Sequence, residues 1–95
     1  MRKFNFHYDA GHGWLEVHLN DLYDVGLSPS DISRYSYKNG QWFYLEEDLD
    51  AGTFLKHYEA AVGHLNFRSI NDGNDSPIRG YERLPLITNL DEIPF

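Results

Sequence analysis

Cysteine is absent from this 95-residue sequence, and so are long apolar runs. Without cysteine the chain forms no disulfide and uses no thiolate, which is typical of proteins from a reducing compartment. A membrane-spanning helix needs about 18 consecutive apolar residues, and no stretch approaches that length. The first residues, MRKFNFHYDAG, alternate in polarity, unlike the apolar region of a signal peptide. We therefore expect a cytoplasmic protein with no membrane partner.

Basic residues are scarce relative to acidic ones. Lysine and arginine total 8 against 15 aspartates and glutamates, which gives a net charge of −7. A protein that binds DNA or RNA directly needs a basic face to neutralise phosphates, so this composition argues against nucleic-acid binding. An acidic protein is instead steered toward basic surfaces. We expect a protein partner with a basic surface.

The sequence also lacks the short motifs that mark common cofactor and metal sites. The glycines of DAGHGW fit neither GxGxxG nor GxxxxGK[ST], and no HExxH pair occurs. We therefore expect no cofactor and no catalytic residue, and predict a non-enzymatic protein.

Two segments near the N-terminus alternate between apolar and polar residues, which is the pattern of half-buried strands. They are RKFNFHY and WLEVH. If their apolar sides share one buried face, Phe6 lies opposite Leu15. The same register places His7 opposite Trp14, with both side chains pointing outward.

The turn between these strands, DAGHG, contains Gly11 and Gly13, which are expected to supply positive φ angles. Three polar side chains, His7, Asp9 and His12, can meet there. Two histidines and a carboxylate can bind zinc or iron. A small metal-dependent hydrolase built on these three residues is therefore the alternative to a plain turn with surface side chains.

Asn39-Gly40 separates two runs rich in aromatic residues, which is typical of a β-hairpin with a type I′ turn. A loop of those two residues pairs Tyr37 with Trp42. Exposed tyrosine and tryptophan dominate binding interfaces, so this face is a candidate for partner contact. Two alternatives stay open. Either C-terminal residues cover the face, namely Leu84, Leu86, Ile87 and Leu90, or the face is itself the core and Phe43 is exposed. The four aromatic side chains that share it are Tyr35, Tyr37, Trp42 and Tyr44.

The longest helical pattern runs from Asp50 to Gly63. Four acids precede or begin it: Glu46, Glu47, Asp48 and Asp50. A helix dipole favours acids at this place, and Asp50 is a candidate N-cap, but the four also form an acidic patch for a basic partner. Glu46 and Glu47 point to opposite faces of their strand, so they cannot serve one metal ion.

Together these patterns predict an α+β fold. We expect an antiparallel sheet built from two β-hairpins and a further strand over residues 64–70, with one main helix packed on one face. A shorter helix is expected over residues 19–26. Residues 1–95 are expected to form a single domain whose C-terminal segment, residues 71–95, is partly irregular.

Four stretches resemble a family of small uncharacterised proteins of bacteria, phages and plasmids: DAGHGWLEV, ISRYSY, YLEED and DSPIRGYER. The resemblance implies a mobile-element origin and a bacterial host, and it assigns no activity. With the acidity, it leads us to expect an inhibitor of a host nucleic-acid-handling defence system, of the anti-CRISPR or anti-restriction type. The alternatives are the hydrolase described above and an accessory domain that oligomerises through the aromatic face.

The inhibitor is expected to bind a basic surface through acidic and aromatic side chains, and its oligomeric state stays open. The expected partner-binding residues are Glu46, Glu47, Asp48, Asp50, Tyr35, Tyr37, Trp42, Tyr44, His12 and Trp14.

Overall fold

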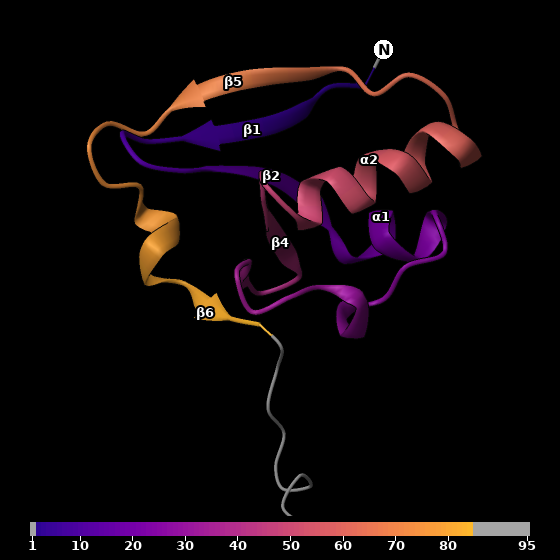
Figure 1. Ribbon diagram of the computed structural model, residues 1–95, viewed down its shortest axis with the longest axis horizontal. Helices are drawn as coiled ribbons and strands as arrows, with labels where there is room; N and C mark the ends of the chain where they lie inside the picture. Colours follow the sequence, from indigo (N-terminus) through magenta and orange to yellow (C-terminus); the bar gives the residue numbers. More distant parts are fainter. Residues whose placement is uncertain (1, 85–95) are drawn as a thin grey trace, which may run out of the picture.

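The computed structural model describes residues 2–84, which form a six-stranded sheet with one main helix (Figure 1). The predicted α+β class is therefore confirmed. The strands are β1 (Phe4–Tyr8), β2 (Gly13–His18), β3 (Tyr37–Asn39), β4 (Trp42–Glu46), β5 (Phe67–Asn71) and β6 (Glu82–Arg83). The helices are α1 (Leu19–Asp24) and α2 (Asp50–Ala61), with short 3-10 turns η1 (Pro29–Asp31) and η2 (Pro77–Gly80).

The sheet has the strand order β5-β1-β2-β4-β3-β6, and it is mixed. β5 runs parallel to β1, whereas the other neighbouring strands are antiparallel. The prediction of a purely antiparallel sheet is therefore wrong. The cause is α2, whose 12 residues carry the chain back along the sheet by about 18 Å. The chain then enters β5 in the same direction as β4, as a helical crossover between parallel strands requires.

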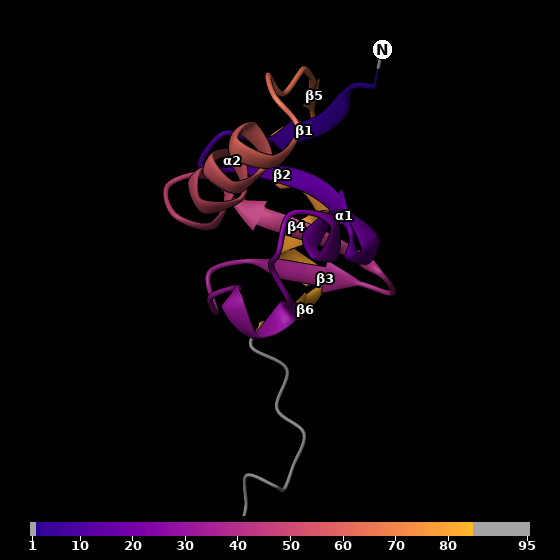
Figure 2. The ribbon, with the colours of Figure 1, turned by 90° about the vertical axis from the view of Figure 1, so that its right-hand side faces the viewer.

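Side chains cover both faces of this sheet. Figures 1 and 2 show α1 and α2 together on one side of it. On that side lies the larger core, which includes Leu15, Val17, Phe43, Leu45 and Phe54. A smaller aromatic cluster lies on the opposite face of the strands, where η2 packs.

The aromatic cluster corrects the prediction that Trp14 points into solvent. The register of β1 and β2 pairs Phe6 with Leu15 and His7 with Trp14, as predicted. Trp14 is nevertheless only 2% exposed, because it packs with Ile78 and because the guanidinium of Arg79 lies over its ring. The residues expected to cover this face are not the ones observed there: Leu84 belongs to the larger core, and Leu86, Ile87 and Leu90 lie outside the described residues. The cover comes from the η2 segment instead. The cluster consists of Trp14, Tyr37, Tyr44 and Ile78, with Tyr81 packed against it.

The pairing of β3 with β4 differs by two residues from the predicted pairing. Tyr37 pairs with Tyr44 instead of Trp42. Gly40 and Gln41 form the loop, and the φ angle of Gly40 is 64°. Glycine is the usual residue at the first loop position of a type II′ turn. A shift of two residues preserves strand alternation, so Tyr37, Trp42 and Tyr44 still share one face.

α2 begins at Asp50, but Asp50 is not its N-cap, contrary to the prediction. Leu49 occupies the cap position and offers no side-chain hydrogen bond. The Asp50 carboxylate instead accepts hydrogen bonds from the Ser33 amide and hydroxyl, at 3.0 and 2.6 Å, and from the Ser36 hydroxyl. Asp50 thus ties the start of α2 to the segment before β3, and at 3% exposure it does not belong to the acidic surface.

The C-terminal segment predicted to be partly irregular is described as far as residue 84, and residues 85–95 lie outside the described residues. The described part contains η2 and β6. Among residues 2–84, no helix has both the length and the apolar character needed to cross a bilayer.

Replacing Phe54 with alanine should remove the main anchor of α2. Phe54 is fully buried, with its ring 5.7 Å from Phe4 and 5.9 Å from Tyr58. We expect the free energy of unfolding to fall by about 3–5 kcal/mol. Urea denaturation followed by circular dichroism measures it. The matched control is Leu55→Ala, which removes a half-exposed side chain of the same helix and should cost about 1 kcal/mol. Equal losses would contradict this account of the core.

Candidate functional site

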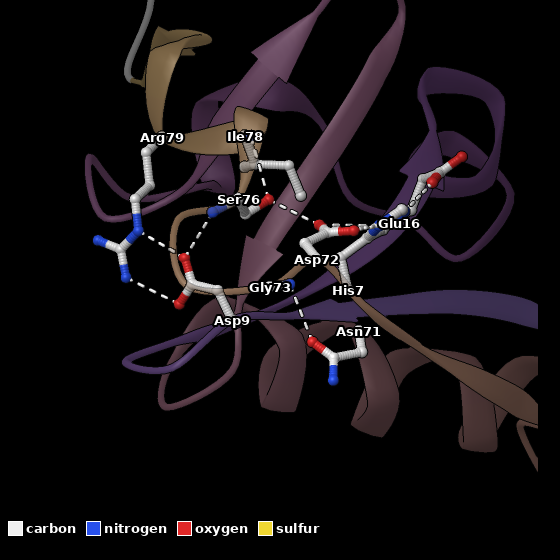
Figure 3. Close-up of polar contacts among 9 residues, drawn as sticks. All are labelled: His7, Asp9, Glu16, Asn71, Asp72, Gly73, Ser76, Ile78 and Arg79. Atoms are coloured by element: carbon white, nitrogen blue, oxygen red, sulfur yellow. Dashed lines mark hydrogen bonds and ion pairs between the residues drawn. The ribbon is translucent and has the colours of Figure 1, made fainter.

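Asp9 joins the turn between β1 and β2 to η2 (Figure 3). Its carboxylate accepts hydrogen bonds from Arg79, at 2.6 Å from Nε and 2.9 Å from Nη2. It also accepts from the backbone amides of Gly11, His12 and Ser76, at 2.9, 3.0 and 2.8 Å. The Arg79 guanidinium, assisted by these amides, holds the pKa of Asp9 well below its usual value despite the burial of the carboxylate.

The two glycines of this turn provide space, which differs from their predicted role. Neither Gly11 nor Gly13 has a positive φ angle. A Cβ atom on Gly13 would lie 2.4 Å from the Phe6 ring, which is too close for any side chain. A Cβ atom on Gly11 would lie 3.1 Å from Nη2 of Arg79. Gly11 therefore lets the arginine approach the turn, and Gly13 lets the strands close over Phe6.

His7 lies between two carboxylates (Figure 3). Its Nε2 is 2.6 Å from Oε1 of Glu16, and its Nδ1 is 3.3 Å from Oδ2 of Asp72. All three side chains are less than one-fifth exposed. Only a ring that carries two protons can donate to both carboxylates. Because the two carboxylates face opposite nitrogens of one ring, they cannot converge on a single metal ion.

Ser76 extends this network, but in an order that does not suit nucleophilic catalysis. Its hydroxyl donates to Oδ2 of Asp72 at 2.6 Å and accepts from the Ile78 amide at 3.2 Å. In a serine hydrolase the hydroxyl contacts the histidine, which acts as its base. Here the aspartate separates Ser76 from His7, and Ser76 is only 3% exposed. The arrangement anchors η2 rather than activating a nucleophile.

The structure does not support the predicted alternative of a metal site at His7, Asp9 and His12. His7 faces Glu16 and Asp72, and the oxygens of Asp9 are occupied by Arg79 and backbone amides. His12 is exposed at the turn. Within residues 2–84, no group of three or more histidine, aspartate or glutamate side chains has a geometry suited to a metal ion.

An open groove of about 390 Å³ lies beside the turn between β4 and α2. Six of the predicted partner-binding residues line it: His12, Trp14, Tyr35, Tyr37, Glu46 and Asp48. The remaining lining residues are Leu49, Arg79 and Arg83. We call it the aromatic groove.

The aromatic groove has an aromatic floor and charges of both signs. Trp14 and Tyr37 form the floor, with ring centroids 6.3 Å apart. The guanidinium of Arg79 lies 5.4 Å from the Trp14 ring, and that of Arg83 lies 4.6 Å from the Tyr37 ring. Tyr35 is 52% exposed at the rim. The arginines of the groove come from the η2–β6 segment, whereas its acids come from the end of β4 and the turn that follows.

The predicted acidic patch is divided among three environments. Glu46 lines the aromatic groove, whereas Glu47 lines a second groove of about 400 Å³ between α2 and the sheet. This confirms that the two side chains point to opposite faces. Asp48 is exposed beside Glu46, and Asp50 is buried. We call the second one the apolar groove; it is lined by Phe6, Leu15, Glu47, Ala51, Gly52, Leu55, Glu59, His64, Leu65 and Phe67.

Two of the predicted aromatic residues lie away from the aromatic groove. Trp42 is 41% exposed and meets His18 edge-on at 5.0 Å. Tyr44 is buried, with its ring 5.2 Å from that of Tyr81. Burial, followed by the charge of Glu16, raises the pKa of Tyr44 to about 12. Tyr44 therefore acts as a core residue, and a partner cannot reach its ring without moving Tyr81.

Sequence reasoning missed the residues of η2 that complete the site. Asp72, Ser76 and Arg79 hold the network together, and Ile78 covers the aromatic cluster. The pair Ser76-Pro77 carried a usable signal, because serine at the N-cap followed by proline at the first helical position is typical of a helix start. The stretch lies in the segment, residues 71–95, that the sequence predicts to be partly irregular.

No protein-family model, no curated protein and no solved structure matches this chain. The resemblance to small proteins of bacteria, phages and plasmids therefore stays a prediction. Any account of the function has to be argued from the residues and contacts above.

Replacing Asp9 with asparagine should destabilise the fold and flatten the dependence of its stability on pH. Because the pKa of Asp9 is lowered in the folded state, its contribution is complete above the usual aspartate pKa of about 3.9 and is lost as the pH falls below it. In that acidic range the wild-type protein should take up about one more proton on unfolding than Asp9→Asn does.

Urea denaturation from about pH 6 to about pH 2 measures this difference. The matched control is Asp24→Asn, which removes an exposed carboxylate at the end of α1. An equally flattened profile for the control would show that general charge, and not the Asp9–Arg79 contact, sets the pH dependence.

Proposed function

We propose that this protein is a non-enzymatic binding domain that recognises a basic protein surface through the aromatic groove. The observation that carries the proposal is the meeting of Tyr35, Glu46 and Asp48 at one open groove, although they come from different segments of the chain. An exposed aromatic ring next to carboxylates suits a lysine or arginine side chain. The stem of such a side chain packs on the ring while its charged head meets the acids.

The surface charge supports the same conclusion. Within residues 2–84, Asp48 uses its side chain in no hydrogen bond or ion pair, so its charge is available to a partner. Beside it, Leu49 is 48% exposed and adds apolar area. Together with a net charge of −7, these features favour rapid association with a basic protein.

The class of partner we propose is a bacterial defence protein that handles nucleic acid, such as a CRISPR effector or a restriction enzyme, met in the host cytoplasm. Such proteins need basic grooves to hold their substrates. An acidic domain bound in such a groove would exclude the nucleic acid and so inhibit cleavage. No direct contact between this protein and nucleic acid is required.

Neutralising the two acids of the aromatic groove should weaken this binding. In the double variant Glu46→Gln/Asp48→Asn, the glutamine keeps the acceptor that Glu46 Oε1 offers to the Asp48 amide. We expect a loss of affinity of roughly 3- to 30-fold, and a weaker dependence of the affinity on salt. The measurement is calorimetric titration into a purified CRISPR effector and a restriction endonuclease, at low and high salt, together with their DNA-cleavage rates.

The matched control is Asp24→Asn/Asp75→Asn, which removes the same charge from exposed positions outside the groove. Tyr35→Ala tests the aromatic contact without a change of charge, and it should cost about tenfold in affinity. Equal losses of affinity for the two double variants would show that the net negative charge of the protein, and not the aromatic groove, determines binding. Failure of the protein to bind either nuclease or to slow its DNA cleavage would contradict the proposed class of partner.

A further inference from the structure

β5 forms one edge of the sheet, and its outer side is open within residues 2–84. Its residues Phe67, Ser69 and Asn71 are exposed. The strand contains no proline, and no bulge interrupts its pairing with β1. Natural sheets usually protect such an edge, because its unpaired backbone groups are a template for another strand. The one charged residue of β5, Arg68, alternates with Phe67 and Ser69 and so points to the face opposite α2. On the helix side the edge is therefore a candidate docking surface.

The hydrogen bonds to β1 show which backbone groups face outward. The Phe4 amide donates to the Asn66 carbonyl, and the Asp72 amide donates to the Tyr8 carbonyl. Even-numbered residues of β5 therefore direct their backbone groups toward β1. Since successive residues of a strand alternate, the amides and carbonyls of the odd-numbered residues point to the open side. They are those of Phe67, Ser69 and Asn71.

The apolar groove runs beside this edge, on the helix side of the sheet. Phe67 is 55% exposed, and its ring lies 5.9 Å from that of Phe6 in the floor of the groove. Leu55, 38% exposed, lines the groove from α2. A strand added to β5 would place every second side chain over these apolar groups.

Two acids line the apolar groove, but only one of them is within reach of the open edge. Glu59 is exposed and lies four residues beyond Leu55, on the same side of α2. Glu47 lies deeper, because its Oε1 is at Gly13 of β2, and a strand added to β5 would lie about 14 Å from that position. Two side chains on one face of an added strand, at positions i and i+2, would therefore reach the apolar floor and Glu59.

We infer that the open edge of β5 and the apolar groove together bind an extended segment of a partner protein with the pattern apolar–x–basic. The segment pairs its backbone with β5, places its apolar side chain against Phe67 and Leu55, and places its basic side chain near Glu59. This mode of recognition draws affinity from main-chain hydrogen bonds and specificity from alternate side chains. The inference concerns a different surface from the aromatic groove and does not depend on the proposed function.

Charge favours a foreign basic segment over a second copy of this chain. If β5 of another copy took the edge, its own odd-numbered side chains would face the groove, and none of them is basic. Each copy also has a net charge of −7, so the two copies repel one another. This repulsion does not apply to a segment that carries a lysine or arginine.

The test uses a fluorescein-labelled peptide, Lys-Thr-Val-Thr-Lys-Thr, titrated into the full chain and followed by fluorescence anisotropy and by amide chemical shifts. The largest shifts are expected at Phe67, Ser69 and Asn71. Ser69→Pro removes an outward amide at a position where edge strands tolerate proline, and it should weaken binding about tenfold or more. Glu59→Gln should weaken it roughly 2- to 5-fold, with a smaller salt dependence.

Three controls keep the result interpretable if Ser69→Pro fails to fold. Of two peptides N-methylated at alternate residues, one in each register, one should lose binding, because only alternate amides of an added strand face β5. The peptide with glutamates in place of lysines should not bind, and Glu46→Gln/Asp48→Asn should bind normally.

Equal binding by both N-methylated peptides, or shifts centred on the aromatic groove, would overturn the inference. So would a dimer in sedimentation that Ser69→Pro abolishes, since a second copy would then occupy the edge.

Discussion

The Asp9 carboxylate is fully removed from solvent, and a buried charge is costly unless donors compensate for it. Five hydrogen bonds provide that compensation, and they come from two segments far apart in the sequence: the turn after β1 and the η2 segment. If η2 moved away, the carboxylate would keep only the amides of Gly11 and His12. The stability of the turn, of η2 and of the aromatic cluster therefore depends on this one contact. The aromatic groove depends on this contact too, because Arg79 forms part of its lining.

The contact between Asp9 and η2 holds a cover on the second face of the sheet, since α2 already covers the first. The β4–α2 turn lies at the boundary between the two faces. Strand alternation sends Glu46 to the face of the aromatic cluster and Glu47 to the face of α2. One short acidic stretch thus supplies charge to two grooves of similar size and different chemistry. Asp50, at the end of the same stretch, is used inside the protein to fix the start of α2.

Local sequence patterns predicted which segments form strands and helices better than they predicted which of these elements pair or pack together. Alternation identified β1 and β2 and paired Phe6 with Leu15, because the apolar side chains of both strands seek one core. It could not predict the direction of β5, since a period of two is the same for parallel and antiparallel strands. Nor could it show that Trp14 is buried. Its cover, Ile78 and Arg79, comes from a segment more than 60 residues away that has no periodic pattern.

The candidate site was also predictable only in part, because the sequence gives residue types but not the contacts between distant segments. The acidic and aromatic residues that line the aromatic groove could be named because charge and aromatic character follow from residue type, whereas the burial of Trp14 and Tyr37 could not. The role of Arg79 was missed because it depends on Asp9, 70 residues earlier in the chain. The alternation argument also preserved the face of Tyr37 and Tyr44 although their register was wrong by two residues, since an even shift keeps each side chain on its side of the sheet.

If the aromatic groove binds the proposed partner, its charges determine which groups that partner presents there. Arg79 is already neutralised by Asp9, whereas Arg83 stacks on Tyr37 and gives one hydrogen bond to the Arg34 carbonyl. Near the exposed ring of Tyr35, the carboxylates of Glu46 and Asp48 call for a cation. Next to Arg83, a second cation would be repelled and a carbonyl or carboxylate would be favoured.

A partner that is uniformly basic would therefore fit this groove less well than one in which a single lysine or arginine is followed by a polar or acidic group. A close fit would also exclude water and so strengthen each of these charge contacts. The groove is thereby more selective than the net charge of the chain suggests, because acidity attracts every basic surface while the alternation of signs admits only some of them.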